Sequence, residues 1–159
     1  MSNLIYTSPS AYSGDTTKWL DLMPQQSPFR FVDRILEINE SHVITEYTFR
    51  RDEYFYKGHF PDLPITPGVI LLEAMAQCAV VLQGLYLLAK QFSLEDARHS
   101  RALFTDSKVE WRAVLPPGEK VIVRSQLLAW RARRIRAAAV MCKESGTEVA
   151  SADLAGVVK

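Results

Sequence analysis

Two side chains that can move protons lie on either side of the start of an apolar segment. His59 stands in a loop rich in glycine and proline, and Glu73 lies in the stretch Val69–Leu82, where the only other polar residue is Gln77. An imidazole can accept a proton near neutral pH. A carboxyl group in apolar surroundings tends to keep its proton. The pair therefore has the residue types needed for general acid–base catalysis.

The apolar segment predicts a buried helix from Pro67 to about Lys90, since a helix that is apolar all round has no solvent face. Thr66 can cap this helix with its hydroxyl, and proline suits the first helical position. Glu73 then lies about two turns in, with Gln77 four positions on along the same face. The segment is long enough to cross a membrane, but its internal polar residues favour a core helix.

The runs Gly58-His59-Phe60-Pro61, Pro67-Gly68-Val69 and Glu73-Ala74-Met75-Ala76-Gln77 resemble those of the (3R)-hydroxyacyl-acyl-carrier-protein dehydratases of type II fatty acid synthesis, which have the hot-dog fold. A glutamate at position 73, rather than aspartate, resembles the branch that dehydrates without isomerising. Asp62, Leu63 and Thr66 depart from the usual pattern, as does Gln25-Gln26-Ser27. The matching runs are Pro28-Phe29, Val32-Asp33-Arg34, Gly58-His59-Phe60-Pro61, Pro64, Pro67-Gly68-Val69, Glu73-Ala74-Met75-Ala76-Gln77 and Pro117-Gly118-Glu119.

The resemblance implies loss of water from a 3-hydroxyacyl thioester to give a trans-2-enoyl thioester. His59 would be the base that takes the C2 proton, and Glu73 the acid that protonates the leaving hydroxyl. The backbone N–H of Gly68, in the first turn of the helix, would stabilise the negative charge on the thioester oxygen. Gln77 would orient Glu73 or a water, with Pro67 supporting the helix start. This chemistry needs no metal or other cofactor.

The resemblance also implies partners. The substrate would arrive on the phosphopantetheine of an acyl carrier protein. The chain would form a homodimer, or a hexamer built from such dimers. Each site would take His59 from one chain and Glu73 from the other. Five side chains could line an acyl tunnel: Tyr54, Phe55, Tyr56, Phe60 and Val69. The first three are consecutive aromatics that could equally serve only to pack the loop. Four arginines could dock the acidic carrier or simply be a solvated strand end: Arg131, Arg133, Arg134 and Arg136.

The rest of the chain favours an α+β fold in which one antiparallel sheet of about six strands wraps the central helix. Residues 1–14 are expected to be a flexible leader and 15–159 a single domain that begins with a short helix over 15–23. His42 is expected to face solvent. The predicted strands are Arg30–Ile38, His42–Arg50, Leu103–Arg112, Lys120–Trp130, Arg134–Lys143 and Glu148–Val158.

Composition narrows the choice of function. The 159 residues carry a formal net charge of +1, with 48% hydrophobic and 23% charged residues, so charge gives no support to nucleic acid binding. The two cysteines have no metal-ligand spacing, and Cys78 is expected in the core, which suggests a reducing, cytoplasmic setting. Two alternatives stay open beside the dehydratase: a hot-dog acyl thioesterase, and a non-catalytic subunit that binds acyl chains.

Overall fold

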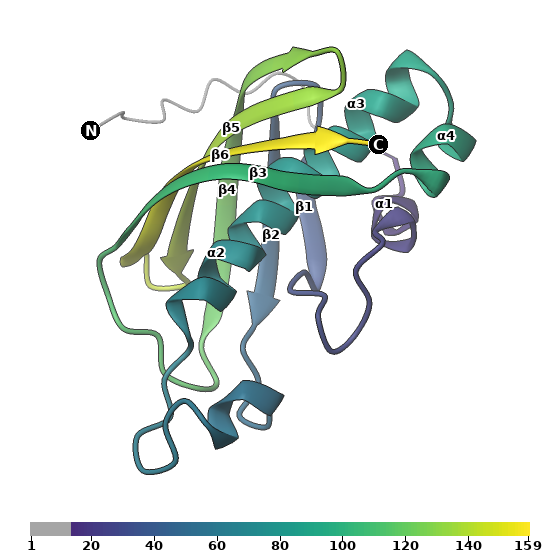
Figure 1. The fold of residues 1–159 in the computed structure, drawn as a ribbon. Helices are drawn as coiled ribbons and strands as arrows, with labels where there is room; N and C mark the ends of the chain where they lie inside the picture. The colour runs from purple at the N-terminus through teal and green to yellow at the C-terminus, as the bar shows by residue number, and fades with distance from the viewer. Residues whose placement is uncertain (1–13) are drawn as a thin grey trace.

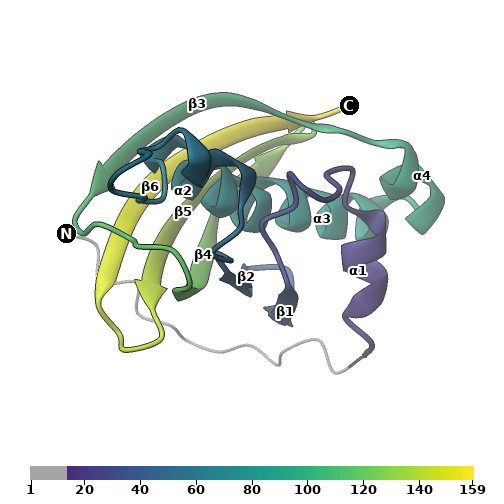
Figure 2. The ribbon, with the colours of Figure 1, turned by 90° about the horizontal axis from the view of Figure 1, so that it is seen from below.

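An antiparallel sheet of six strands curves around one long helix, as the sequence predicts (Figures 1 and 2). The computed structural model describes residues 14–159, so the predicted leader lies, apart from Gly14, outside the described residues. The strand order is β1-β2-β4-β5-β6-β3, which leaves β1 and β3 at the two edges. The strands are β1 (Arg34–Ile38), β2 (His42–Thr48), β3 (Ala102–Trp111), β4 (Lys120–Arg131), β5 (Arg134–Lys143) and β6 (Glu148–Val158).

The central helix consists of three consecutive segments, α2 (Gly68–Ala76), the π-helical η2 (Gln77–Leu82) and α3 (Gln83–Gln91). It lies in the concave face of the sheet, where its apolar residues form the core with the inward-facing residues of the strands (Figure 2). Gly68–Gln91 is long and apolar enough to span a membrane by composition, but 78% of its most apolar window is buried against the rest of the protein. This burial fits the predicted core helix.

Among the described residues, three short helices lie outside the central helix. The first, α1 (Thr17–Leu22), falls inside the predicted range 15–23, and the Asp15 carboxylate accepts the Thr17 N–H at 2.9 Å. The second, η1 (Tyr54–Lys57), is a 3₁₀ turn that leads into the His59 loop. The third, α4 (Leu94–His99), is capped by the Ser93 side chain.

The predicted cap of the central helix is wrong. The helix begins at Gly68 with Pro67 as N-cap residue, and no side chain caps it. Thr66 is buried, and its hydroxyl is bonded to that of Tyr56 at 2.6 Å. Because this hydroxyl is used to hold η1 against the helix start, it does not serve as a cap.

Two predictions about the first hairpin are also wrong. The first strand begins at Arg34 rather than Arg30, and ahead of it the Phe31 N–H and the Phe29 carbonyl bond to the Gln77 side chain of the central helix. His42 does not face solvent: it is 2% exposed, with its Nε2 3.0 Å from a Glu37 carboxylate oxygen and 3.1 Å from the Asn39 amide. The polar groups of this tight turn face one another, so the imidazole can be buried at little cost.

Candidate active site

The His59 loop fixes which ring nitrogen of the histidine can act as a base. His59 Nδ1 lies 3.1 Å from the carbonyl oxygen of Ile65, and the Ile65 N–H donates to the His59 carbonyl at 3.0 Å. A carbonyl oxygen only accepts hydrogen bonds, so Nδ1 must carry the proton. In the neutral ring the lone pair is then on Nε2. His59 is therefore held as a base with one defined tautomer, on a half-buried side chain.

Gln77 donates a hydrogen bond to the Glu73 carboxyl group, and its other hydrogen bonds allow its side-chain amide only one orientation. Its Oε1 accepts the Phe31 N–H at 2.7 Å, so its Nε2 must point the other way. That Nε2 donates to the Phe29 carbonyl at 2.8 Å and to Glu73 Oε1 at 2.9 Å. Both amide protons are thereby used, and Glu73 Oε1 always meets a donor. The second carboxyl oxygen is left to carry a proton.

The surroundings of Glu73 favour the protonated acid. Burial raises the pKa of Glu73 above its ordinary value, and the hydrogen bond from Gln77 offsets only part of that rise. The bond offsets burial because a donor stabilises the ionised form. Glu73 can thus serve as a proton donor, whereas His59 can serve as a proton acceptor. No hydrogen bond or ion pair joins these two residues within one chain.

A first testable consequence concerns stability. Since the pKa of Glu73 is raised on folding, its ionisation lowers the free energy of unfolding as pH rises from about 4.3, its usual unfolded value, through the folded pKa. Glu73→Gln keeps a neutral side chain at every pH. We expect the stability of this variant relative to wild type to increase from pH 4 to pH 7, as measured by urea unfolding of both proteins. A difference that stays constant over this range would contradict a raised pKa.

The start of the central helix is held by a residue that sequence reasoning missed. Trp111, at the end of β3, donates its indole N–H to the Gly68 carbonyl at 3.0 Å. Its ring lies so close that a Cβ added at Gly68 would be 2.8 Å from it. Glycine is needed here for space, and the indole fixes the first turn of a helix that has no side-chain cap. Only the tertiary pairing of β3 with the helix start brings these residues together, so no local pattern could have shown it.

The predicted tunnel residues divide into two groups. Tyr56 is buried against Thr66, and Phe55 packs its ring against those of Phe31 and Phe49, at centroid distances of 6.4 and 6.5 Å. These two aromatics therefore join the His59 loop to the segment that binds Gln77. The others present apolar surface in the single chain: Tyr54, Phe60 and Val69 are exposed, Val69 at 69%.

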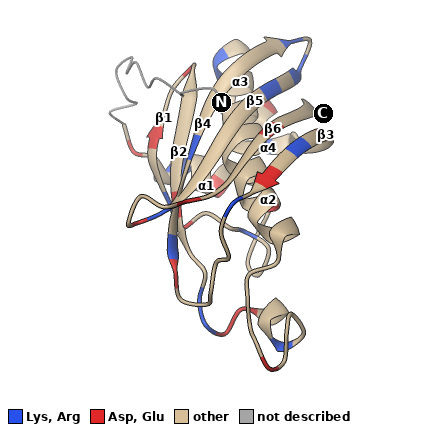
Figure 3. Cartoon of the chain, turned by 90° about the vertical axis from the view of Figure 1, so that its left-hand side faces the viewer, with Lys and Arg blue, Asp and Glu red and all other residues tan. Residues whose placement is uncertain are grey.

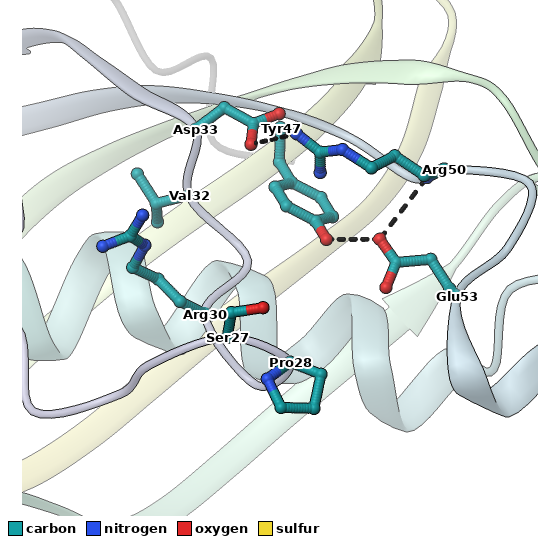
Figure 4. Close-up of a pocket in the computed structure, with 8 residues that line it drawn as sticks. All are labelled: Ser27, Pro28, Arg30, Val32, Asp33, Tyr47, Arg50 and Glu53. Atoms are coloured by element: carbon teal, nitrogen blue, oxygen red, sulfur yellow. Dashed lines mark hydrogen bonds and ion pairs between the residues drawn. The ribbon is translucent and has the colours of Figure 1, made fainter.

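A polar pocket of about 210 Å³ lies beside Phe29–Phe31, and hydrogen bonds or ion pairs join four of the residues that line it, Asp33, Tyr47, Arg50 and Glu53 (Figure 4). The Arg50 guanidinium lies 2.7 Å from an Asp33 carboxylate oxygen, and the Tyr47 hydroxyl donates to Glu53. Burial, with the carboxylate of Glu53, raises the pKa of Tyr47. The pocket contains neither His59 nor Glu73. Its network instead ties β2 to the residues that precede η1.

The four predicted docking arginines lie at the hairpin between β4 and β5, at the opposite end of the sheet from the His59 loop (Figure 3). Ala132 and Arg133 form its turn with positive φ values of 49° and 59°. The guanidinium of Arg133 lies 4.9 Å from the ring centroid of Phe92. Within one chain these arginines are therefore remote from the proposed acid and base.

Other reactive groups do not form a second centre near this site. Cys78 is buried and Cys142 half-buried, both as free thiols, and burial raises the pKa of Cys78 to about 11. Cys78 is a core residue, as predicted. Among residues 14–159, no three His, Cys, Asp or Glu side chains are grouped as metal ligands would be.

The sequence of this chain is similar to that of a known protein family over most of its length. Residues 23–153 match the FabA-like domain family, and the chain belongs to this family. It is 36% identical over 154 residues to the 3-hydroxyacyl-[acyl-carrier-protein] dehydratase FabZ of Thermus thermophilus, covering 91% of this chain and 97% of that protein.

Solved structures show that the fold is the hot-dog fold shared by several kinds of enzyme. The dehydratase heterocomplex ApeI:P from Xenorhabdus doucetiae superposes with a TM-score of 0.70 at 16% identity, covering 87% of this chain and 89% of that one. A hypothetical thioesterase from Streptococcus pneumoniae superposes with a TM-score of 0.55 at 12% identity, covering 79% and 84%. At these identities the likeness concerns the fold alone.

Proposed function

We propose that this protein removes water from 3-hydroxyacyl thioesters borne on an acyl carrier protein and releases trans-2-enoyl thioesters. The observation that carries the proposal is the pairing of two positioned groups of opposite tendency, a carboxyl group whose pKa is raised by burial and an imidazole whose Nε2 is the basic nitrogen. The similarity to FabZ dehydratases over nearly the whole chain supports the same reaction.

The two groups divide the reaction between them. His59 Nε2 takes the proton from C2, and the electron pair of that C–H bond forms the C2=C3 double bond. The C3–O bond breaks as Glu73 donates its proton to the departing hydroxyl, which leaves as water. Negative charge on the thioester oxygen would be stabilised by the Gly68 N–H at the helix start. Afterwards His59 is protonated and Glu73 ionised, and exchange with solvent restores both. None of these steps requires a cofactor.

The reverse reaction tests the proposal simply. Adding the protein to a trans-2-enoyl thioester should lower the absorbance of the conjugated enoyl group as water adds across the double bond. The final mixture should have the same composition as one that starts from the 3-hydroxyacyl thioester. Absorbance that does not change with either a carrier-bound or a short-chain enoyl thioester would contradict dehydratase activity.

An acyl thioesterase is the main alternative, since thioesterases share the fold. A thioesterase would need an ionised carboxylate to activate water. The raised pKa of Glu73 works against that role and in favour of an acid. A non-catalytic acyl-binding subunit would have no use for a histidine held in one tautomer or for a carboxyl group held by Gln77.

The oxyanion role of Gly68 gives a prediction for Trp111. Trp111→Phe keeps the ring but removes the N–H that holds the Gly68 carbonyl. We expect kcat to fall about fivefold, the scale of one hydrogen bond, with little change in KM. Trp130→Phe is the matched control, because it removes an exposed indole bond to Gln91. An equal loss in both variants, or a change confined to KM, would contradict a role at the helix start.

We further propose that the active unit is a cytoplasmic homodimer, open to assembly into a hexamer, with each site built from two chains. The absence of a hydrogen bond or ion pair between His59 and Glu73 within one chain supports a shared site. Exposed apolar side chains near the helix start, Phe60 and Val69 among them, would then line the acyl tunnel once a second chain covers them.

Docking of the carrier on the arginine hairpin fits the same dimer. Strand β3 runs from the hairpin end, where Val158 pairs with Ala102, to the site end, where Trp111 meets Gly68. A second copy paired antiparallel along β3 is reversed end for end. Its arginines would then lie at the same end of the joint sheet as this chain's His59 loop, where they could attract an acidic carrier.

A further inference from the structure

Strand β3 is a long edge strand whose outer side is open. It pairs with β6 on one side only, and in the part of the chain that the structure describes no strand pairs with its other side (Figure 2). Its ten residues are exposed or half-buried throughout. Open edges of this length are normally covered or paired, because their free N–H and C=O groups can bind another strand.

The side chains of β3 separate by charge between the two faces of the sheet. Beyond the bulge near Thr105, residues alternate regularly against β6. Trp111 bonds to the central helix and Val109 packs on the core, so these two face inward. The residues between and before them therefore face outward. This outer row consists of Asp106, Lys108 and Glu110, whose charges are negative, positive and negative in turn. Figure 3 shows charged residues of both signs along β3.

Two of these charges form no ion pair among the described residues, although the register of β3 with β6 places Asp153 opposite Lys108. Glu110 lies 2.7 Å from Arg112, which also bonds to Glu148. Neither Asp106 nor Lys108 forms an ion pair with any residue of the described chain. These two residues have opposite charges and lie two positions apart on one face of an open edge. A second strand whose charges also alternate could therefore complement them.

Symmetry decides how such a row can meet a copy of itself. If two copies of β3 pair antiparallel with their inner faces on the same side, directly opposite residues must share a face. The twofold axis then passes between two copies of one residue. If that residue is Lys108, lysine meets lysine and Asp106 meets Glu110, so every opposed pair repels.

The charges attract when the twofold axis passes between the two copies of an inward-facing residue. With the axis at Ser107, Asp106 lies opposite Lys108 of the partner subunit. With the axis at Val109, Lys108 lies opposite Glu110 of the partner subunit. In both registers Lys108 faces a carboxylate. Directly opposed charges of unlike sign stabilise an antiparallel pair, and like charges destabilise it.

We propose that Asp106, Lys108 and Glu110 form a self-complementary code by which β3 selects a second copy of this chain and fixes its register at Ser107 or Val109. The inference deepens the homodimer of the proposed function and rests on it. The row favours an identical chain over a different protein, because one alternating sequence satisfies both sides. Exposed apolar side chains of the same strand, Phe104 and Trp111, would add contact area.

Charge exchange tests this code. Lys108→Glu makes the row entirely negative, and the double variant Asp106→Lys with Glu110→Lys makes it entirely positive. Each should weaken its own dimer about tenfold or more at low salt, because attractive pairs become repulsive. An equimolar mixture of the two should form heterodimers in preference to either homodimer. Dissociation constants come from analytical ultracentrifugation, and native mass spectrometry identifies the pairs.

A matched control separates the edge from a general effect of charge. Arg124→Glu reverses an exposed charge on β4, which lies inside the sheet between β2 and β5. This variant should dimerise as the wild type does. If Lys108→Glu also dimerises as tightly as wild type, or if the mixture forms no excess of heterodimer, the code is wrong. In those cases a wild-type dimer that still converts the enoyl thioester would leave the proposed function intact. A wild type that is monomeric and active would overturn the homodimer and the code together.

Discussion

Replacing His59 by alanine, or Glu73 by glutamine, should lower turnover by about a hundredfold or more, the scale for losing a positioned acid or base. His59→Ala removes the nitrogen that takes the C2 proton. Glu73→Gln keeps the hydrogen bond to Gln77 possible but cannot donate a proton to the leaving hydroxyl. The measurement is the rate of enoyl formation from a 3-hydroxyacyl thioester, with folding checked by circular dichroism.

Two exposed residues provide matched controls for these substitutions. His99→Ala and Glu95→Gln make the same chemical changes on α4, where the two side chains are exposed and close to each other. Both variants should retain wild-type turnover. Near-normal turnover in a well-folded His59→Ala or Glu73→Gln protein would remove that residue from the mechanism.

Mixing two inactive chains should restore activity if each site takes His59 from one chain and Glu73 from the other. In a dimer of His59→Ala with Glu73→Ala, one site then lacks both groups and the other has both intact. Random pairing makes about half of the dimers mixed, so about a quarter of the wild-type activity should return in a symmetric two-site dimer. Co-expression with two different affinity tags allows the mixed dimers to be isolated and assayed.

The opposite result is equally clear. If His59 and Glu73 of one chain form a complete site, every site in the mixture lacks one group, and no activity returns. Mixed dimers that native mass spectrometry confirms but that remain inactive would therefore contradict the shared site. They would not contradict the roles of the two residues, which the single substitutions test separately.

The fold was predictable from sequence because periodicity changes sharply along the chain. The apolar segment after Gly68 could be buried on all sides only inside a sheet, and the later strands agree with their predicted ranges to within one or two residues. The errors fall where tertiary contacts override local preference. Phe31 falls in the predicted strand Arg30–Ile38, but its N–H bonds to the Gln77 side chain. His42 is expected to face solvent, but it is enclosed by the polar groups of its own turn.

The candidate site was predictable in residue types but not in arrangement. The sequence motif indicates His59, Glu73 and Gln77, since each lies in a run with a defined loop or helix position. Nothing in that motif shows that Ile65 sets the tautomer of His59. Nor does it show that Trp111, 43 positions after Gly68, holds the helix start. Both contacts arise when distant segments meet, so they require the folded structure.

The most direct measurement follows one sample of a 3-hydroxyacyl thioester on its carrier in two ways at once. Absorbance reports the conjugated enoyl thioester, and a thiol reagent reports any free phosphopantetheine. A dehydratase should produce the enoyl band up to an equilibrium value while thiol appears no faster than in a sample without protein. Thiol release without an enoyl band would identify a thioesterase. Tight binding of the acyl carrier with neither signal would identify a non-catalytic subunit, and either outcome would contradict the proposed dehydration by His59 and Glu73.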